Sequence, residues 1–238
     1  MKKIICTAAL ACAGAFAQAP GAMPGPAKGG NDRVLLLDAH QMPLPPPPAE
    51  LLKMQGKSMM KAEDGFSVLD KAPERVRQFM NELEVVKGRQ SGKAPPTTPM
   101  VVNSLGDLKL GVSTAAVRSG KLIGAVPQGT IINGAWTGVE RYFHIEGAGF
   151  SRVSETNMAA SGGMFYMNKA AVNTSVAGKP AISAVFTDDG GRRIEEVLWV
   201  DGGKLNKVTF APDMRNTRHG LTKTNASMSA FSLASELR

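Results

Sequence analysis

Hydrophobic and polar residues alternate in short runs through most of the second half of the chain. From Met100 onward, turn residues separate these runs about every ten positions, a spacing typical of an antiparallel sandwich or barrel. The predicted strands cover residues 100–104, 107–112, 114–118, 121–126, 138–146, 149–155, 163–167, 171–177, 181–187, 193–200 and 204–210. No internal repeat of fixed period is visible. The second half is therefore predicted to be one β-rich unit.

The turns between the last strands predict how these strands pair. A two-residue turn at 202–203, both glycines, would place Asp201 opposite Lys204. In the preceding loop, turn residues at 188–191 would place Thr187 opposite Arg192. Register matters because a shift of one residue turns every side chain of a strand to the other face.

With these registers, and with a three-residue loop at 178–180, one face of the sheet is almost wholly apolar. It carries Val172, Val176, Ile182, Phe186, Val197, Trp199, Val208 and Phe210. The opposite face mixes aliphatic with polar residues, namely Val185, Ile194, Leu198, Val200 and Leu205 with Ser183, Glu196, Lys207 and Thr209. This second face has too much apolar surface to stay in contact with water, so it needs a cover.

Helical spacing predicts that cover. A helix is expected from about Lys71 to Lys87, with Asp70 as its N-cap and Gly88 as its C-terminal stop. Its apolar stripe consists of Val76, Phe79, Met80, Leu83 and Val86. The charged residues lie largely off the stripe and are expected to face solvent: Arg75, Arg77, Glu82, Glu84 and Lys87. The pattern also predicts a short helix at 49–55 and, at 225–237, either a terminal helix or a mobile end.

Composition divides the chain into regions. Twelve of the 15 prolines precede residue 100, whereas ten of the 13 aromatic residues lie at position 136 or later. The predicted organisation is a signal peptide at 1–17, a disordered Gly/Pro-rich tether at 18–48, a small helical region and linker at 49–99, a β-rich domain at 100–212 and a basic tail at 213–238. The predicted fold class is α+β. Its C-terminal domain is predominantly antiparallel β, a sandwich or partly open barrel, with one or two packed N-terminal helices.

The N-terminus predicts export. A positive start is followed by an apolar stretch from Ile4 to Phe16 and by an Ala-x-Ala site ending at Ala17, which is typical of a cleaved signal peptide. A lipoprotein signal ending before Cys12 is the less favoured alternative, because the leader would be unusually short. Both cysteines of the chain, Cys6 and Cys12, lie inside this segment. The mature protein would begin at Gln18, without cysteine, in the periplasm or outside the cell.

The net charge of the chain indicates which classes of partner it could bind. The chain has a net charge of +8, and removal of the signal leaves 26 basic and 20 acidic residues, a net charge of +6. A basic cluster with Arg215, Arg218 and Lys223 follows the last predicted strand. It favours contact with an anionic envelope component. Nucleic acid is not indicated, because no aromatic residues are interleaved with these charges.

Candidate chemistry is sparse. The three histidines, His40, His144 and His219, have no metal-binding spacing, and neither a metal nor a cofactor is predicted. Met158, Met164 and Met167 are interpreted as core residues rather than copper ligands. Alternation places Tyr142, His144 and Glu146 on one strand face, which is expected to be solvated.

Two functions remain open at this level. The favoured one is a non-catalytic binding or interaction module of the cell envelope, with an anionic component or a protein as its partner. The alternative is a hydrolase of an envelope polymer, with a site assembled from distant residues such as His144, Glu146 and Asp213. The lack of a local catalytic motif favours the binding module. The pattern does not indicate an oligomeric state.

Overall fold

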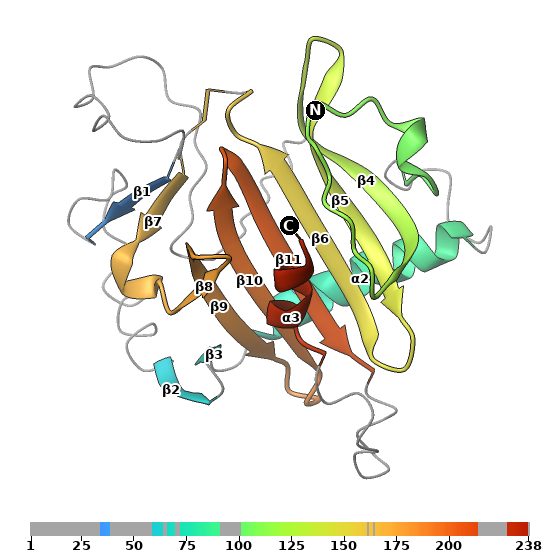
Figure 1. Cartoon of the computed structure of the whole chain (residues 1–238). Helices are drawn as coiled ribbons and strands as arrows, with labels where there is room; N and C mark the ends of the chain where they lie inside the picture. The colour runs from blue at the N-terminus through green and yellow to red at the C-terminus, as the bar shows by residue number, and fades with distance from the viewer. Residues whose placement is uncertain are drawn as a thin grey trace, which may run out of the picture.

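The computed structural model describes residues 34–38, 59–63, 66–69, 72–90, 101–160, 162–163, 165–213 and 228–237. Within this part of the chain, a mostly antiparallel sheet is packed between two helices, which confirms the α+β class. In Figure 1, α3 (Ala230–Glu236) lies in front of the sheet and α2 (Pro73–Gln90) lies behind it.

The main sheet has the strand order β2-β3-β9-β10-β11-β6-β5-β4, and β8 adds to β9. Its strands are β2 (Met59–Glu63), β3 (Phe66–Leu69), β4 (Lys121–Ile132), β5 (Ala135–Ile145), β6 (Gly149–Asn157), β8 (Thr174–Val176), β9 (Lys179–Thr187), β10 (Arg193–Asp201) and β11 (Lys204–Pro212). Neighbouring strands are antiparallel except β3 and β9. A separate two-stranded parallel sheet joins β1 (Val34–Leu37) to β7 (Phe165–Asn168).

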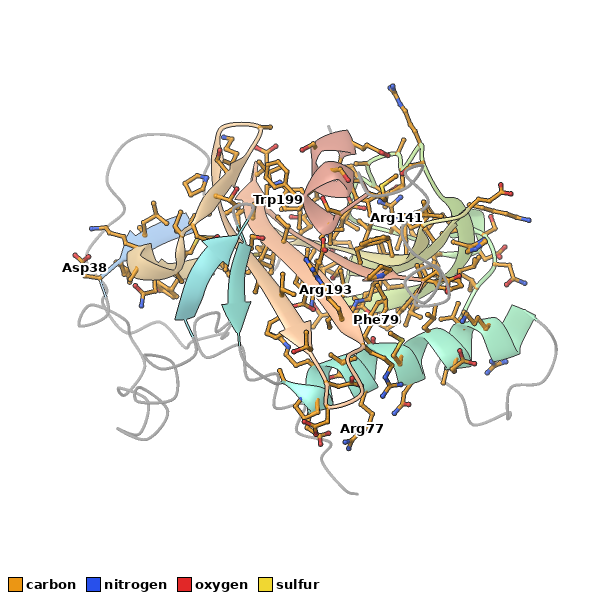
Figure 2. The ribbon with its side chains drawn as sticks, turned by 90° about the horizontal axis from the view of Figure 1, so that it is seen from below. Asp38, Arg77, Phe79, Arg141, Arg193 and Trp199 are labelled. Carbon is orange, nitrogen blue, oxygen red and sulfur yellow. The ribbon has the colours of Figure 1, made fainter. Side chains whose placement is uncertain are left out.

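Helix α2 covers one half of its sheet face. Its buried residues Val76, Phe79, Leu83 and Val86 pack against the sheet residues Ile123, Tyr142, Ala184, Phe186, Ile194 and Ala211. In Figure 2, Phe79 points toward the sheet and Arg77 points away from it. The predicted stripe is therefore the packed surface of the helix. The aliphatic residues at the other half of this face, Leu198, Val200 and Leu205, pack instead with Phe165 and Met167 of β7.

The opposite sheet face is covered by α3 and by the segment before β4. Leu233 and Ala234 of α3 pack against a core that includes Trp199, Val208 and Phe210. Ser229 caps the helix by accepting a hydrogen bond from the Ser232 amide at 3.1 Å. The predicted strands at 100–104, 107–112 and 114–118 are wrong, because this segment contains isolated bridges and a 3₁₀ turn at Leu105–Asp107 instead.

The predicted register is correct for one hairpin and wrong for the next. Asp201 pairs with Lys204 as expected. Thr187, however, pairs with Arg193 rather than with Arg192, so β9 is displaced by one residue. The cause lies in the loop, where Asp188 lies opposite Arg192. The Asp188 amide donates to the Arg192 carbonyl at 3.0 Å and the Asp188 carboxylate accepts from the Arg192 amide at 2.8 Å, so the turn consists of the three residues 189–191.

Because of this displacement, each side chain of β9 lies on the sheet face opposite to the predicted one. Ile182 and Phe186 lie on the α2 face, not beside Trp199 as predicted. The preceding turn also differs from the predicted loop at 178–180, because Val176 pairs with Lys179 around a two-residue turn.

The N-terminal half is more structured than predicted. Strand β1 lies within the stretch that was predicted to be a disordered tether at 18–48, and β2 and β3 lie within the region 49–99, for which a small helical region and a linker were predicted. The short helix at 49–55 lies outside the described residues. Among the described residues, no helix is long and apolar enough to cross a membrane.

Candidate functional site

A row of polar residues lies beside α2 on the sheet. Glu196 of β10, Thr209 of β11, Arg152 of β6 and Tyr142 of β5 are successive partners across the ladder. Directly paired residues of antiparallel strands point to the same face, so all four side chains lie on the face that α2 covers. The helix thus packs beside polar as well as apolar positions.

Arg152 connects the row to the helix. Its Nη1 atom forms an ion pair with Glu82 of α2, and its Nη2 atom donates a hydrogen bond to Thr209 Oγ1 at 3.3 Å. Thr209 Oγ1 in turn donates to Glu196 Oε1 at 3.1 Å. Burial lowers the pKa of Arg152, but the carboxylates of Glu140 and Glu82 outweigh this effect and raise it. Arg152 is therefore a permanent positive charge.

At the other end of the row, Glu196 is negatively charged at neutral pH. Burial raises the pKa of its carboxyl group, but Lys207 and Arg75 outweigh this effect and hold the pKa below its ordinary value. Arg75 contacts Glu196 Oε2 at 3.3 Å and lies over the Phe186 ring, 4.4 Å from its centroid. This end of the row connects the start of α2 to the centre of the sheet.

Tyr142 has one hydroxyl proton and two carboxylate neighbours. Its hydroxyl oxygen lies 3.2 Å from Glu140 Oε2 and 3.4 Å from Glu82 Oε2. Burial and the charge of Glu140 raise the pKa of Tyr142. The hydroxyl therefore stays protonated and can donate to only one of the two carboxylates at a time.

A groove of about 710 Å³ runs along the flank of α2 above this end of the row. Its lining residues are Glu74, Arg77, Gln78, Asn81, Glu82, Val85, Val86, Val101, Val126, Gln128, Glu140 and Tyr142. The side chains of Glu82 and Glu140 remain 29% and 13% exposed. Glu140 Oε1 lies 3.9 Å from Arg152 Nη1 and accepts no hydrogen bond from the described residues. The groove is therefore bordered by carboxylates that keep contact with solvent.

A second buried carboxylate lies on the opposite face of the sheet. Glu155 is completely buried and contacts Arg141 Nη2 at 2.5 Å, Lys204 Nζ at 2.8 Å and the amide of Ala115 at 3.0 Å. Asn157, two residues along β6, donates to the Gly111 carbonyl at 2.9 Å. These contacts fasten the segment before β4 to the sheet.

The predicted catalytic residues do not form a constellation. His144 is exposed, and its ring packs against Phe150 with the centroids 5.0 Å apart. Glu146 is exposed in the turn that follows β5. Asp213 lies close to this turn through its backbone, since its amide donates to the Ala148 carbonyl at 2.9 Å. No hydrogen bond or ion pair joins His144 to Glu146 in the part of the chain that the structure describes.

The predicted binding residues Arg215, Arg218 and Lys223 lie outside the described residues, as do His40 and His219. Met158 and Met167 are buried among apolar side chains, whereas Met164 is outside the described residues. The described ranges contain no group of three or more His, Cys, Asp or Glu residues that could hold a metal ion.

Sequence reasoning missed the groove residues Glu82, Glu140 and Tyr142. The strand face of Tyr142 was expected to be solvated, but Tyr142 is buried beneath α2. One signal was present, because alternation along the strand predicted which side chains share a face with Tyr142. It did not show that a helix 60 residues earlier would cover that face.

Comparison of the chain with models of known protein families, with characterised proteins and with solved structures finds no match.

Proposed function

We propose that this protein is a non-catalytic binding module of the cell envelope and that the groove beside α2 is its binding site. The observation that supports the proposal best is the groove itself. Its volume of about 710 Å³ lies within the usual range of ligand sites, and it combines an apolar wall with a small number of polar groups.

The chemistry of the groove favours recognition over catalysis. A general acid or base works best with a pKa close to the working pH. The pKa values of Tyr142 and Arg152 are both raised, which moves these groups further from neutrality. They are thus fixed donors and charges, which suits the orientation of a bound partner.

Site-specific photocrosslinking in cells tests the proposal. A photoreactive residue in place of Asn81, which lines the groove, is expected to form adducts with an envelope component. The matched control places the same residue at Glu84, which is 72% exposed but does not line the groove. Adducts at Asn81 and not at Glu84 support the proposal, and mass spectrometry identifies their class. Equal adducts at both positions, or none at Asn81, contradict it.

Export is part of the proposed function. The Ala-x-Ala site that ends at Ala17 supports cleavage before Gln18 and a periplasmic or secreted mature protein. Intact mass of the protein recovered from the envelope fraction tests this step. A mass that corresponds to a lipid-modified Cys12 would contradict the proposed soluble form.

Contact with an anionic envelope component is a second proposal for the same protein. One observation supports it: Asp213, the last residue of the described range 165–213, donates through its amide to the Ala148 carbonyl at 2.9 Å, at a sheet end that also carries Lys121, which pairs with His144. Salt screens such contacts over about 10 Å at 0.1 M. Binding to anionic vesicles should therefore fall steeply with salt, and should fall further in a variant with Arg215→Ser, Arg218→Ser and Lys223→Ser. Binding that neither change affects contradicts this contact.

A further inference from the structure

We propose that the groove binds an extended peptide segment of a partner protein and holds a lysine or arginine side chain of that segment between Glu82 and Glu140. This inference rests on the proposed function and adds the chemical class of the ligand. Three properties of the groove support it: its charge, its unused acceptor and its shape.

The charged side chains that line the groove are mainly acidic. Glu74, Glu82 and Glu140 line it together with one cation, Arg77, and Arg77 forms an ion pair with Glu74 at 3.0 Å. The buried cations that act on Glu140, Arg152 and Lys207, are not among the lining residues. Glu82 and Glu140 are therefore the carboxylates that a cationic group would meet in the groove, in a partly desolvated setting where charge-assisted hydrogen bonds are strongest.

The acceptor geometry matches a single cation. Both carboxylates lie within 3.4 Å of the Tyr142 hydroxyl oxygen, so they border the same small space. Tyr142 can supply a proton to only one of them, and Glu140 Oε1 accepts no hydrogen bond from the described residues. Glu82 already accepts a hydrogen bond from Gln78 Nε2 at 3.0 Å and pairs with Arg152. An ammonium or guanidinium group carries several donors, so it can bond to Glu140 Oε1 while it also contacts Glu82.

The shape of the groove matches a peptide. Its α2 side runs from Glu74 to Val86, about 18 Å at a helical rise of about 1.5 Å per residue, which is the length of about five extended residues. Valine side chains line part of the groove and can pack against the aliphatic stem of a lysine or arginine. The amides of Gln78, Asn81 and Gln128 offer both donors and acceptors to a peptide backbone.

Calorimetric titration of the full mature protein with designed peptides tests the inference. The probes are acetylated and amidated pentapeptides of alanine with a central lysine or with a central norleucine, which has a similar stem and no charge. The lysine peptide is expected to bind about tenfold more tightly than the norleucine peptide. Glu140→Gln should reduce the affinity for the lysine peptide by about tenfold and leave that for norleucine unchanged.

Glu84→Gln provides the matched control, because it removes the same charge from the exposed part of α2 outside the groove. Its affinity for the lysine peptide should equal that of the unmodified protein. Circular dichroism establishes that both variants are folded. An equal loss in the two variants would overturn the inference, since the effect would then be one of overall charge.

The remaining outcomes separate this inference from the proposed function. Equal binding of the two peptides, or no binding of either while photoadducts still form at Asn81, overturns the basic-peptide assignment and leaves the binding module intact. The absence of both peptide binding and adducts overturns the two together. Tighter binding of the lysine peptide after Arg215→Ser, Arg218→Ser and Lys223→Ser also overturns the assignment to a partner, because the chain's own basic segment would then be the occupant.

Discussion

Carboxylates on the two faces of the sheet differ in how far they are buried and in how many hydrogen-bond donors they contact. On the α3 face, the carboxylate of Glu155 is fully buried and receives three donors. On the α2 face, Glu82 and Glu140 keep 29% and 13% exposure and share Tyr142 and Arg152 between them. Both clusters lie against the same sheet, and both include an arginine of a strand that has neighbours on both sides.

This difference separates a structural contact from a site that can accept a ligand. A carboxylate that is saturated by donors and closed to water has nothing left to bind, so the role of Glu155 is to fix the segment before β4. A carboxylate with an unused oxygen beside a groove can still exchange water for a ligand donor. Glu140 has this property, since its Oε1 atom accepts no hydrogen bond within the described ranges of the chain. Changes at the two clusters should therefore separate stability from binding.

The largest effect on stability is expected for Glu155→Ala. The variant leaves the buried guanidinium of Arg141 and the Lys204 ammonium without their carboxylate, and the loss of one partner of a buried ion pair costs about 3–5 kcal/mol. Chemical denaturation measures the free energy of unfolding. A cost below about 1 kcal/mol would mean that the cluster does not fasten the segment before β4.

A smaller effect is expected for Glu82→Ala. Arg152 loses an ion pair but keeps Glu140 and Glu196 nearby, and the partial exposure of Glu82 weakens the pair that is lost. We expect a cost of about 1–2 kcal/mol in the free energy of unfolding. A loss as large as that for Glu155→Ala would contradict the distinction between the two clusters.

Acid should destabilise the α2 face through Glu196. Its pKa in the folded protein lies below the ordinary value of 4.5, so its stabilising contribution is complete above pH 4.5 and is lost as the pH falls through the folded value. The free energy of unfolding, measured by denaturation between pH 3 and 6, should fall less steeply with acid in Glu196→Gln than in the unmodified protein. Identical slopes would contradict the role of Lys207 and Arg75 beside this carboxylate.

The smallest effect is spectroscopic. Tyr142 has a raised pKa, so the folded protein favours its neutral form, and this contribution to stability is present below the ordinary pKa of 10.0 and lost as the pH rises above it. Tyr166→Phe leaves Tyr142 as the one tyrosine of the chain. Its phenolate absorbance should rise only when the protein unfolds. A titration at the ordinary pKa in the folded variant would mean that the hydroxyl is not buried between the carboxylates.

Sequence patterns predict those parts of the fold that depend on local rules. The Gly202-Gly203 turn fixes the β10–β11 register, and the spacing from Val76 to Val86 predicts the packed stripe of α2. The β9 register fails because Asp188 bonds to Arg192 through both its amide and its carboxylate, which leaves three residues in the turn instead of the predicted four. The pattern of hydrophobic residues does not reveal a contact of this kind.

The groove was beyond prediction for a related reason. Its residues come from α2, β4 and β5 and from Val101 in the segment before β4, and only the packing of the helix across the sheet brings Glu82 to Tyr142. Similarly, the predicted strands at 107–112 and 114–118 alternate as strands do, yet contacts with Asn157 and Glu155 hold Gly111 and Ala115 outside the sheet. In each case a long-range polar contact decides the structure, and local periodicity contains no information about it.

An NMR titration of the mature protein with the lysine pentapeptide tests the central claim most directly. The account predicts that the backbone amide signals of Asn81, Glu82, Val126 and Glu140 shift together as the peptide is added. It predicts no shift for Ala115, which contacts the saturated carboxylate on the other face. Shifts at Ala115 and its neighbours without shifts along the groove would contradict the assignment of α2 and its flank as the binding site.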